Sequence, residues 1–273
     1  SHDIRTPING ILGMLTIVDT CRDNKDKMDD CLAKIDVSAK HLLSLVNDVL
    51  DMTKLERDTF TLESKPFNLD RVCIEAAEIV CFQAESAGLH VEEEHPDVRN
   101  VNLLGSELYL KKILLNLFSN CIKYNKPGGA IYTRMRELEH TDDTVTYEFF
   151  IRDTGVGMTQ DFIDNHLFEA FTQGDNAARS QYGGTGLGMS IVAQLVKKMN
   201  GTIQVESTVG EGSSFTVVLP FAIDHDPPAV AEKTPPAGDL RGKRLLVVED
   251  NELNMEIAEF MLKSTGGRGG PCV

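Results

Sequence analysis

The sequence predicts an α+β protein in which a long helical hairpin precedes a domain of helices packed on a sheet. Apolar residues recur at three- and four-residue steps over residues 4–18 and 28–55, as on one face of a helix. Residues 130–136 and 145–152 alternate between apolar and polar, as paired strands do. The 273-residue chain is 41% hydrophobic and 25% charged, which is typical of a soluble globular protein.

The hairpin consists of two predicted amphipathic helices joined by a polar turn at residues 22–27. Pro7 lies near the start of the first helix, where it weakens the local backbone bonding. The apolar spacing of the second helix is close to a seven-residue repeat, the pattern of a bundle or coiled-coil helix. Because two such helices cannot cover their own apolar faces, we expect half of a dimeric four-helix bundle. No cap or leader precedes Ser1, so we expect this hairpin to be truncated at its N-terminus.

The pattern changes after Arg57 to short alternating stretches mixed with helical ones, which indicates a helix-on-sheet domain with mostly antiparallel strands. Asn200-Gly201 is a signal for the end of its last helix. The expected helices cover residues 68–87, 107–124 and 189–200, and the expected strands cover 59–65, 90–95, 130–136, 145–152, 202–207 and 214–220.

The sequence of the C-terminal part predicts a linker followed by the start of another domain. Residues 224–242 contain four prolines and no apolar periodicity, as linkers do. A buried strand, an acidic turn and one helix follow, and the final residues show no pattern. We therefore divide the chain into four parts, at residues 1–58, 59–223, 224–242 and 243–273.

Charge and cysteine content narrow the function classes. The chain has 27 basic and 42 acidic residues, so its formal net charge is −15. This balance argues against a nucleic-acid groove, which needs a basic surface, but not against nucleotides, whose phosphates need only a few local donors. The six cysteines are far apart and form no CxxC pair, which argues against a zinc or redox site. Free thiols and the lack of an apolar run long enough to cross a bilayer lead us to expect a cytoplasmic location.

Three motifs carry chemistry. In SHDIRTPIN, Asp3 directly follows His2 and could accept a proton from one imidazole nitrogen, which leaves the other free as a nucleophile. In NLFSNCIKYN, Asn116, Asn120 and Lys123 follow one another at helical spacing, so their amides and ammonium could hold a metal ion and polyphosphate oxygens. Taken singly, the first motif is better explained by a surface histidine, and the second by the polar face of a packed helix.

The third motif is a pair of glycine clusters, DTGVGM (153–158) and GGTGLGM (183–189). Neither fits a P-loop or a dinucleotide fingerprint. The second cluster opens a helix whose N-terminus favours a phosphate. Asp153 ends a predicted strand, where its carboxylate could accept a hydrogen bond from an exocyclic amine such as that of adenine. A simple turn is the alternative explanation for either cluster.

Together the segments SHDIRTPIN, NLFSNCIKYN, DTGVGM, FEAF and GGTGLGM resemble, in order and spacing, the H, N, G1, F and G2 boxes of sensor histidine kinases. The resemblance covers residues 1–221, including the closing pattern at Ser207–Phe215. The segment LLVVEDNELN resembles the start of a response-regulator receiver domain, which makes the arrangement similar to that of hybrid histidine kinases. The resemblance implies a Bergerat-type α/β sandwich, shared with gyrase and HSP90 ATPases, at residues 59–223.

The resemblance also implies residue roles. His2 would accept the γ-phosphoryl group of ATP, Asp3 would orient its ring and take its proton, and Thr6 would position water for dephosphorylating a partner. Asn120 would bind the Mg²⁺ that accompanies ATP. Asp153 would accept a hydrogen bond from the adenine amino group. Residues 159–183 would form a mobile lid. The further nucleotide-binding positions implied are Asn116, Lys123, Tyr124, Gly155, Gly157, Phe168, Phe171, Arg179, Gly184, Thr185, Gly186, Leu187 and Gly188. Glu249 and Asp250 would be the acidic pair of a truncated receiver that lacks its phosphoacceptor aspartate.

The function implied is that of an ATP-dependent protein-histidine autokinase of a two-component system, with ATP and Mg²⁺ as cofactors. Its expected partners are a second copy of the chain and a receiver domain, in cis or in trans. One alternative is an ATPase switch of the gyrase and HSP90 class, but that class needs a catalytic glutamate where Asn116 stands. Another is a binding module that docks a receiver without transferring phosphate.

Overall fold

The computed structural model describes residues 2–21, 24–57, 60–94, 98–172, 185–227 and Met255, without the side chains of His2 and Asp3. The chain divides into two compact units, residues 1–227 and 228–273, and the elements below belong to the first. Within the described residues, no helix combines the length and the apolar character needed to span a membrane.

The N-terminal hairpin consists of α1 (His2–Thr20) and α2 (Lys25–Leu55). Asn24 caps α2, because its side chain accepts a hydrogen bond from the backbone N–H of Lys27 (3.1 Å). Cys31 and Leu45 are buried between the helices, whereas many other large apolar side chains remain exposed. These exposed side chains are Ile4, Ile8, Leu12 and Leu15 of α1, and Leu32, Val37, Leu43, Val46 and Leu50 of α2.

After the hairpin, the chain forms a seven-stranded sheet. Its strand order is β1-β3-β7-β5-β4-β2, and β6 pairs with β7 beside this path. The strand pairs are antiparallel except for β2 and β4, which run parallel. The strands are β1 (Lys65–Asn68), β2 (His90–Glu94), β3 (Asn102–Gly105), β4 (Ala130–His140), β5 (Thr144–Asp153), β6 (Thr202–Thr208) and β7 (Gly212–Ile223).

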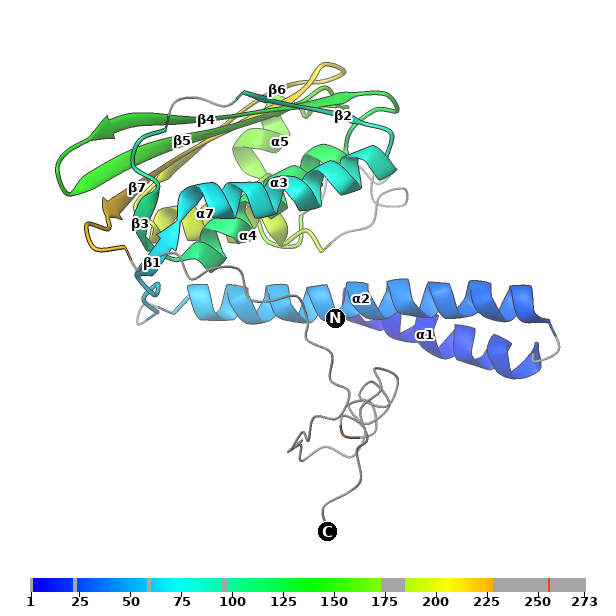
Figure 1. Ribbon diagram of the computed structural model, residues 1–273. Helices are drawn as coiled ribbons and strands as arrows, with labels where there is room; N and C mark the ends of the chain where they lie inside the picture. The colour runs from blue at the N-terminus through cyan, green and yellow to red at the C-terminus, as the bar shows by residue number, and fades with distance from the viewer. Residues whose placement is uncertain are drawn as a thin grey trace, which may run out of the picture. The chain divides into compact units, whose positions relative to one another are not determined.

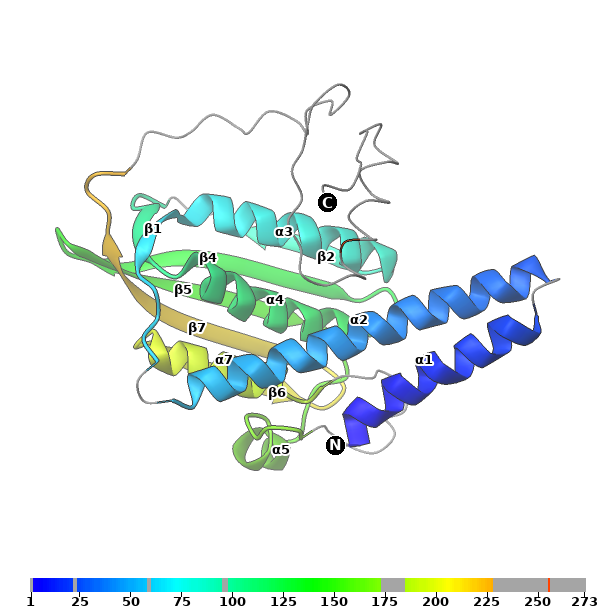
Figure 2. The same cartoon turned by 90° about the horizontal axis from the view of Figure 1, so that it is seen from below.

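Three helices, α3 (Leu69–Ser86), α4 (Glu107–Lys123) and α7 (Gly188–Lys198), lie side by side across one face of this sheet (Figures 1 and 2). A short helix, α5 (Gln160–Asn165), follows β5. Alternate residues of β5 are buried, which directs one face of the strand into the core beneath the helices. The core residues of β5 are Val145, Tyr147, Phe149 and Ile151, and those of α4 are Leu110, Ile113, Leu114, Leu117, Phe118 and Cys121.

The predicted fold class, a helical hairpin followed by an α/β sheet domain, is confirmed. The helices expected at 68–87, 107–124 and 189–200 are present, and Asn200 ends the last one with a positive φ of 56°. The strand expected at 59–65 is wrong, because the strand begins at Lys65 and contains Pro66. Proline is tolerated there because β1 is an edge strand and its missing N–H removes no ladder bond on the open side. The sequence analysis also missed β3 and α5, which are too short to show periodicity.

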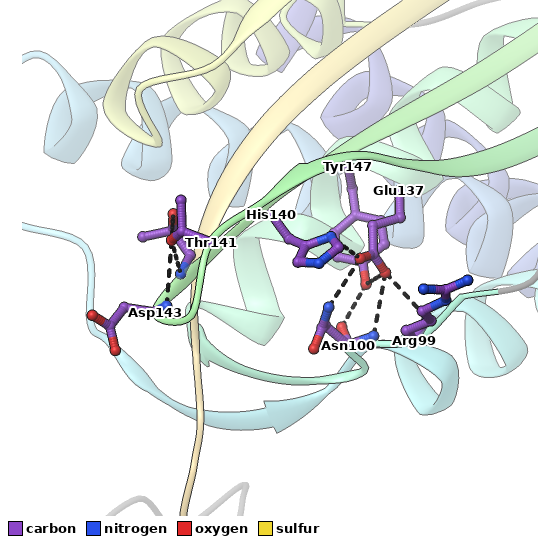
Figure 3. Close-up of polar contacts among 8 residues, drawn as sticks. Arg99, Asn100, Glu137, His140, Thr141, Asp143 and Tyr147 are labelled. Atoms are coloured by element: carbon purple, nitrogen blue, oxygen red, sulfur yellow. Dashed lines mark hydrogen bonds and ion pairs between the residues drawn. The ribbon is translucent and has the colours of Figure 1, made fainter.

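Glu137 ties the outer end of the β4–β5 hairpin to the segment before β3 (Figure 3). Its carboxylate accepts hydrogen bonds from the backbone N–H groups of Arg99 (3.1 Å) and Asn100 (3.3 Å) and from the Tyr147 hydroxyl (3.3 Å). The side-chain amide of Asn100 (2.9 Å) also donates to it, and His140 Nδ1 lies 3.1 Å away. Burial alone would raise the pKa of Glu137, but these donors outweigh it and lower that pKa.

Replacing Glu137 with glutamine removes the charge and sets an NH₂ group against these donors. A hydrogen bond to a charged group contributes about 1.5–3 kcal/mol. We therefore expect Glu137→Gln to lower the free energy of unfolding by about 2 kcal/mol at pH 7, measured by urea denaturation. The folded-state pKa lies below the ordinary value of 4.5, so the wild type loses this stabilisation as pH falls from 4.5 through the folded-state pKa. The difference between the two proteins should therefore shrink in acid.

Glu139, which is exposed on the same strand, provides the matched control. We expect Glu139→Gln to change the free energy of unfolding by less than about 0.5 kcal/mol, as surface substitutions usually do. Equal losses for the two variants would show that the carboxylate of Glu137 has no special role in this corner of the sheet.

Candidate nucleotide-binding site

Asp153 is a buried carboxylate at the end of β5, with 4% of its surface exposed. Its Oδ1 accepts hydrogen bonds from the backbone N–H groups of Gly155 (2.8 Å) and Ser213 (3.2 Å). Burial raises the pKa of Asp153, and these donors, together with the thiol of Cys121, counteract part of that rise. A carboxylate offers about four lone-pair sites, so three donors leave room for one more, such as an exocyclic amine.

Cys121 lies on α4 and is fully buried. Burial is the main reason why the pKa of its thiol is raised well above its ordinary value, and the charge of the Asp153 carboxylate raises that pKa further. The thiol is therefore neutral at pH 7 and acts as a donor.

The turn after β5 needs glycine at two positions. Gly157 has a φ of +68°, and a Cβ there would collide with the carbonyl oxygen of Thr208. Gly155 lies against the carbonyl oxygen of Tyr124, which accepts a hydrogen bond from the N–H of Val156 (3.0 Å). The C-terminal end of α4 is thus joined directly to this turn.

The middle of α4 contacts the start of α7 through Asn116. Asn116 is half-buried, and its Nδ2 donates to the carbonyl oxygen of Lys112 (2.9 Å). A Cβ on Gly188, the first residue of α7, would lie 2.9 Å from Asn116 Oδ1. Asn120 and Lys123 follow on α4 and are half-buried, and Lys123 Nζ lies 4.5 Å from the centre of the Tyr124 ring. One helix therefore brings the amide-lysine motif next to both glycine clusters.

The segment before α7 forms a compact turn. The hydroxyl of Thr185 accepts a hydrogen bond from the N–H of Leu187 (3.1 Å), and Leu187 is fully buried. Gly186 has a φ of +68°, and its carbonyl oxygen accepts from the N–H of Phe171 (3.1 Å). Phe171 itself is exposed with a φ of 64°, whereas Phe168 is half-buried and packs against the core.

Several predicted site residues lie outside the described residues: Arg179, Gly184, Glu249, Asp250 and the side chains of His2 and Asp3. His2 is the first residue of α1, and the exposed Thr6 follows one helical turn later. Of the segment expected to form a lid, residues 159–172 are described and include α5.

The described residues contain no cluster of three or more His, Cys, Asp or Glu side chains suited to a metal ion. The site does offer neutral amide oxygens, which could hold a divalent ion together with oxygens brought by a ligand. Mg²⁺ is commonly bound in this way, by few protein groups together with substrate phosphates. Asn116 and Asn120, one turn apart on α4, fit such a role.

Three parts of this site are not predicted from the sequence. The sequence alone predicts only a free thiol at Cys121, although its position beside Asn120 is a signal. Ser213 contributes a backbone N–H, which no side-chain pattern reveals. Lys112 of α4 pairs with Asp48 and Asp51 of α2, and only the fold brings these residues together.

Two known domain families match the chain. Residues 1–58 match the His Kinase A (phospho-acceptor) domain. Residues 105–223 match the family of histidine kinase-, DNA gyrase B- and HSP90-like ATPases. The second match includes α4, the turn after Asp153 and the start of α7.

The curated relatives that match the chain include histidine kinases. The chain is 37% identical over 266 residues to the sensor histidine kinase GacS of Pseudomonas protegens. The matched region is 97% of this chain and 28% of that protein. It is 35% identical to the signal transduction histidine-protein kinase BarA of Escherichia coli, covering 97% of this chain and 28% of the relative. The chain thus spans less than a third of the length of these relatives.

Among solved structures, full-length ShkA in complex with AMPPNP is similar, with a TM-score of 0.63 and 27% identity over 100% of this chain and 54% of that one. The Acinetobacter baumannii histidine kinase AdeS shares the fold, with a TM-score of 0.59 and 22% identity over 80% of this chain and 97% of that one. Residues 1–58 therefore form a domain of the His Kinase A (phospho-acceptor) type and residues 105–223 an ATPase-type domain, and over both domains the chain is similar to sensor histidine kinases.

Proposed function

We propose that this chain is an ATP-dependent protein-histidine autokinase that phosphorylates His2. One observation carries the nucleotide half of this proposal: α4 brings its amides and Lys123 between the buried Asp153 carboxylate and the N-terminus of α7. Asp153 is suited to an adenine amine, and the start of α7 is suited to phosphates. The similarity to ShkA, whose solved complex holds AMPPNP, supports the same ligand class.

Each predicted nucleotide residue has a role in this proposal. Asp153 accepts a hydrogen bond from the adenine amino group, and the turn with Gly155 and Gly157 lies beneath the base. Asn116, Asn120 and Lys123 act on the metal and the phosphates, and Tyr124 packs near the nucleotide. Phe168 and Phe171 anchor the lid, and Arg179 of the lid reaches a phosphate. The segment before α7 forms the hinge on the phosphate side: Gly184, Thr185, Gly186, Leu187 and Gly188. Mg²⁺, held by Asn120 and the phosphates, neutralises phosphate charge when bound.

The transfer step is a displacement at the γ-phosphorus. An imidazole nitrogen of His2 forms a bond to phosphorus while the bond to the bridging β–γ oxygen breaks, and ADP leaves. Asp3 takes the proton from the other ring nitrogen. Positioning and charge neutralisation account for most of the acceleration of such reactions.

The hairpin contributes the partner surfaces in this proposal. Its exposed apolar side chains are suited to a second copy of the chain, which would complete a four-helix bundle. A receiver aspartate is the proposed onward acceptor, and Thr6 is proposed to position water when the phosphorylated receiver is hydrolysed. Residues 243–273 are proposed to start a receiver of their own, with Glu249 and Asp250 as its acidic pair.

The first test is phosphorylation with Mg²⁺ and γ-labelled ATP. We expect the wild type to carry label that is stable in base and lost in acid. His2→Gln should carry none, and Asn120→Ala should lose activity by roughly 100-fold, as loss of a group that supports a metal does. His225→Gln, which alters an exposed histidine beyond β7, is the matched control and should label like the wild type.

Two results would contradict the autokinase proposal. Release of ADP without protein labelling would favour an ATPase switch of the gyrase and HSP90 class. Nucleotide binding without transfer, even with a full-length partner added, would favour a receiver-docking module.

A second test concerns the thiol of Cys121, which acts on the Asp153 carboxylate. Its hydrogen bond lowers the pKa of Asp153, so Cys121→Ala should raise that pKa. An adenine amine needs the ionised carboxylate as acceptor, so nucleotide affinity should fall off at a higher pH in the variant than in the wild type. We expect affinity at pH 7 to drop by roughly 3- to 10-fold, the effect of about 1 kcal/mol, measured by calorimetry with an ATP analogue between pH 5 and 8.

Cys31→Ala removes a buried thiol from α2 and is the matched control. It should leave both the affinity and its pH profile unchanged, and Cys121→Ser should restore most of the affinity. An unchanged pH profile in Cys121→Ala would show that the thiol only fills space.

A further inference from the structure

The last turns of α2 are built into the ATPase-type domain. Leu55 is 3% exposed and belongs to the domain's core, and Val49 and Met52 pack against the same core. The Met52 sulfur lies 3.2 Å from Gln194 Nε2 of α7. We call the contact of residues 48–55 with this domain the α2 seam.

Two carboxylates of the α2 seam meet one lysine of α4. Lys112 Nζ lies 3.5 Å from Asp48 Oδ1 and also pairs with Asp51. All three side chains are mostly buried, with 14–23% of their surface exposed. Ion pairs this shielded are screened far less by salt than surface pairs. Two carboxylates against one ammonium leave a local charge of −1.

Asp48 makes one further contact. The hydroxyl of Thr185 donates a hydrogen bond to Asp48 Oδ2 (3.2 Å), while the same hydroxyl accepts from the N–H of Leu187. Asp48 is therefore bound at once by the turn before α7 and by the helix that carries Asn116. Asp51 pairs with the lysine, and among the described residues it makes no hydrogen bond to this turn.

These donors are the kind that a phosphate would use. A hydroxyl and an ammonium beside the N-terminus of α7 are suited to any anion, and here they hold a carboxylate of the hairpin. A triphosphate entering beside Gly188 would compete for Thr185 and would repel the excess negative charge of Asp48 and Asp51. The seam and the nucleotide therefore make opposing demands on the same groups.

We propose that Asp48 is an internal competitor of the nucleotide's phosphates, so that nucleotide binding loosens the α2 seam. This inference rests on the proposed function, because it takes the turn at Thr185 to be the phosphate side of the site. By linkage the effect is reciprocal: the factor by which the nucleotide weakens the seam equals the factor by which the closed seam weakens nucleotide binding, so loosening the seam tightens that binding. The device would free the ATPase-type domain from α2 when the nucleotide is in place.

The test measures the affinity of the full chain for Mg²⁺ and a non-hydrolysable ATP analogue by calorimetry. Asp48→Asn should bind the analogue at least about 5-fold more tightly than the wild type, the lower end of typical coupling between sites. Asp51→Asn, which removes an equal charge without touching Thr185, should have a smaller effect. Asp36→Asn, which breaks an exposed pair with Lys40 on the same helix, should have none. Circular dichroism would confirm that each variant is folded.

Hydrogen exchange of the wild type supplies a readout that needs no variant. The analogue should accelerate amide exchange in residues 48–55, because a helix end released from the core frays. Unchanged or weaker binding by Asp48→Asn would overturn the inference, and so would an equal gain in Asp51→Asn or an exchange rate that the analogue does not alter. Failure of both the wild type and Asp48→Asn to bind the analogue would instead overturn the proposed nucleotide site, and the inference with it.

Discussion

The packing of α4 on the sheet is the constraint on which the rest of the unit depends. Its apolar side, from Leu110 to Cys121, is buried against the strands, so the rotation of the helix is determined by the hydrophobic core. That rotation decides where its polar residues lie. Asn116 meets the start of α7, Tyr124 meets the turn after Asp153, and Lys112 meets α2. A shift of one residue in this helix would disconnect all three contacts.

Local patterns explain why much of the fold could be predicted. The helices α3, α4 and α7 each bury a regular stripe, and β5 and most of β7 alternate in burial, so periodicity predicts them. The hairpin is predictable from the apolar spacing of its sequence, although much of that apolar face is exposed. The edge strand β1 could not be placed, because Pro66 is usually a reason to end a strand and becomes acceptable only beside an open edge. Strands as short as β3 carry too few residues for any period, and their existence depends on neighbours that pair with them.

The candidate site likewise contains residues that the local sequence predicts and residues that only the fold brings together. Asp153 and the glycines after it are predictable because a chain that turns sharply at the end of a strand needs them locally. Beside the local N–H of Gly155, Asp153 is contacted from α4 and β7, which are distant in sequence, and the donor from β7 is a backbone N–H with no signature in the amino-acid sequence. The pairing of Lys112 with Asp48 is likewise invisible before the fold is known, because each residue alone resembles any charged position on a helix.

The strong negative charge of the chain and a polyanionic ligand are compatible for a physical reason. Charges separated by more than about 10 Å are largely screened at ordinary ionic strength, so the total of −15 matters less than the groups within reach of the phosphates. Near α7 those groups include three donors: Lys112, the hydroxyl of Thr185 and the helix N-terminus. The carboxylates of Asp48 and Asp51 are the exception, and they are attached to a different element, α2. An anion that must enter there can change the position of that helix, whereas acidic residues scattered over the surface would only lower its affinity slightly.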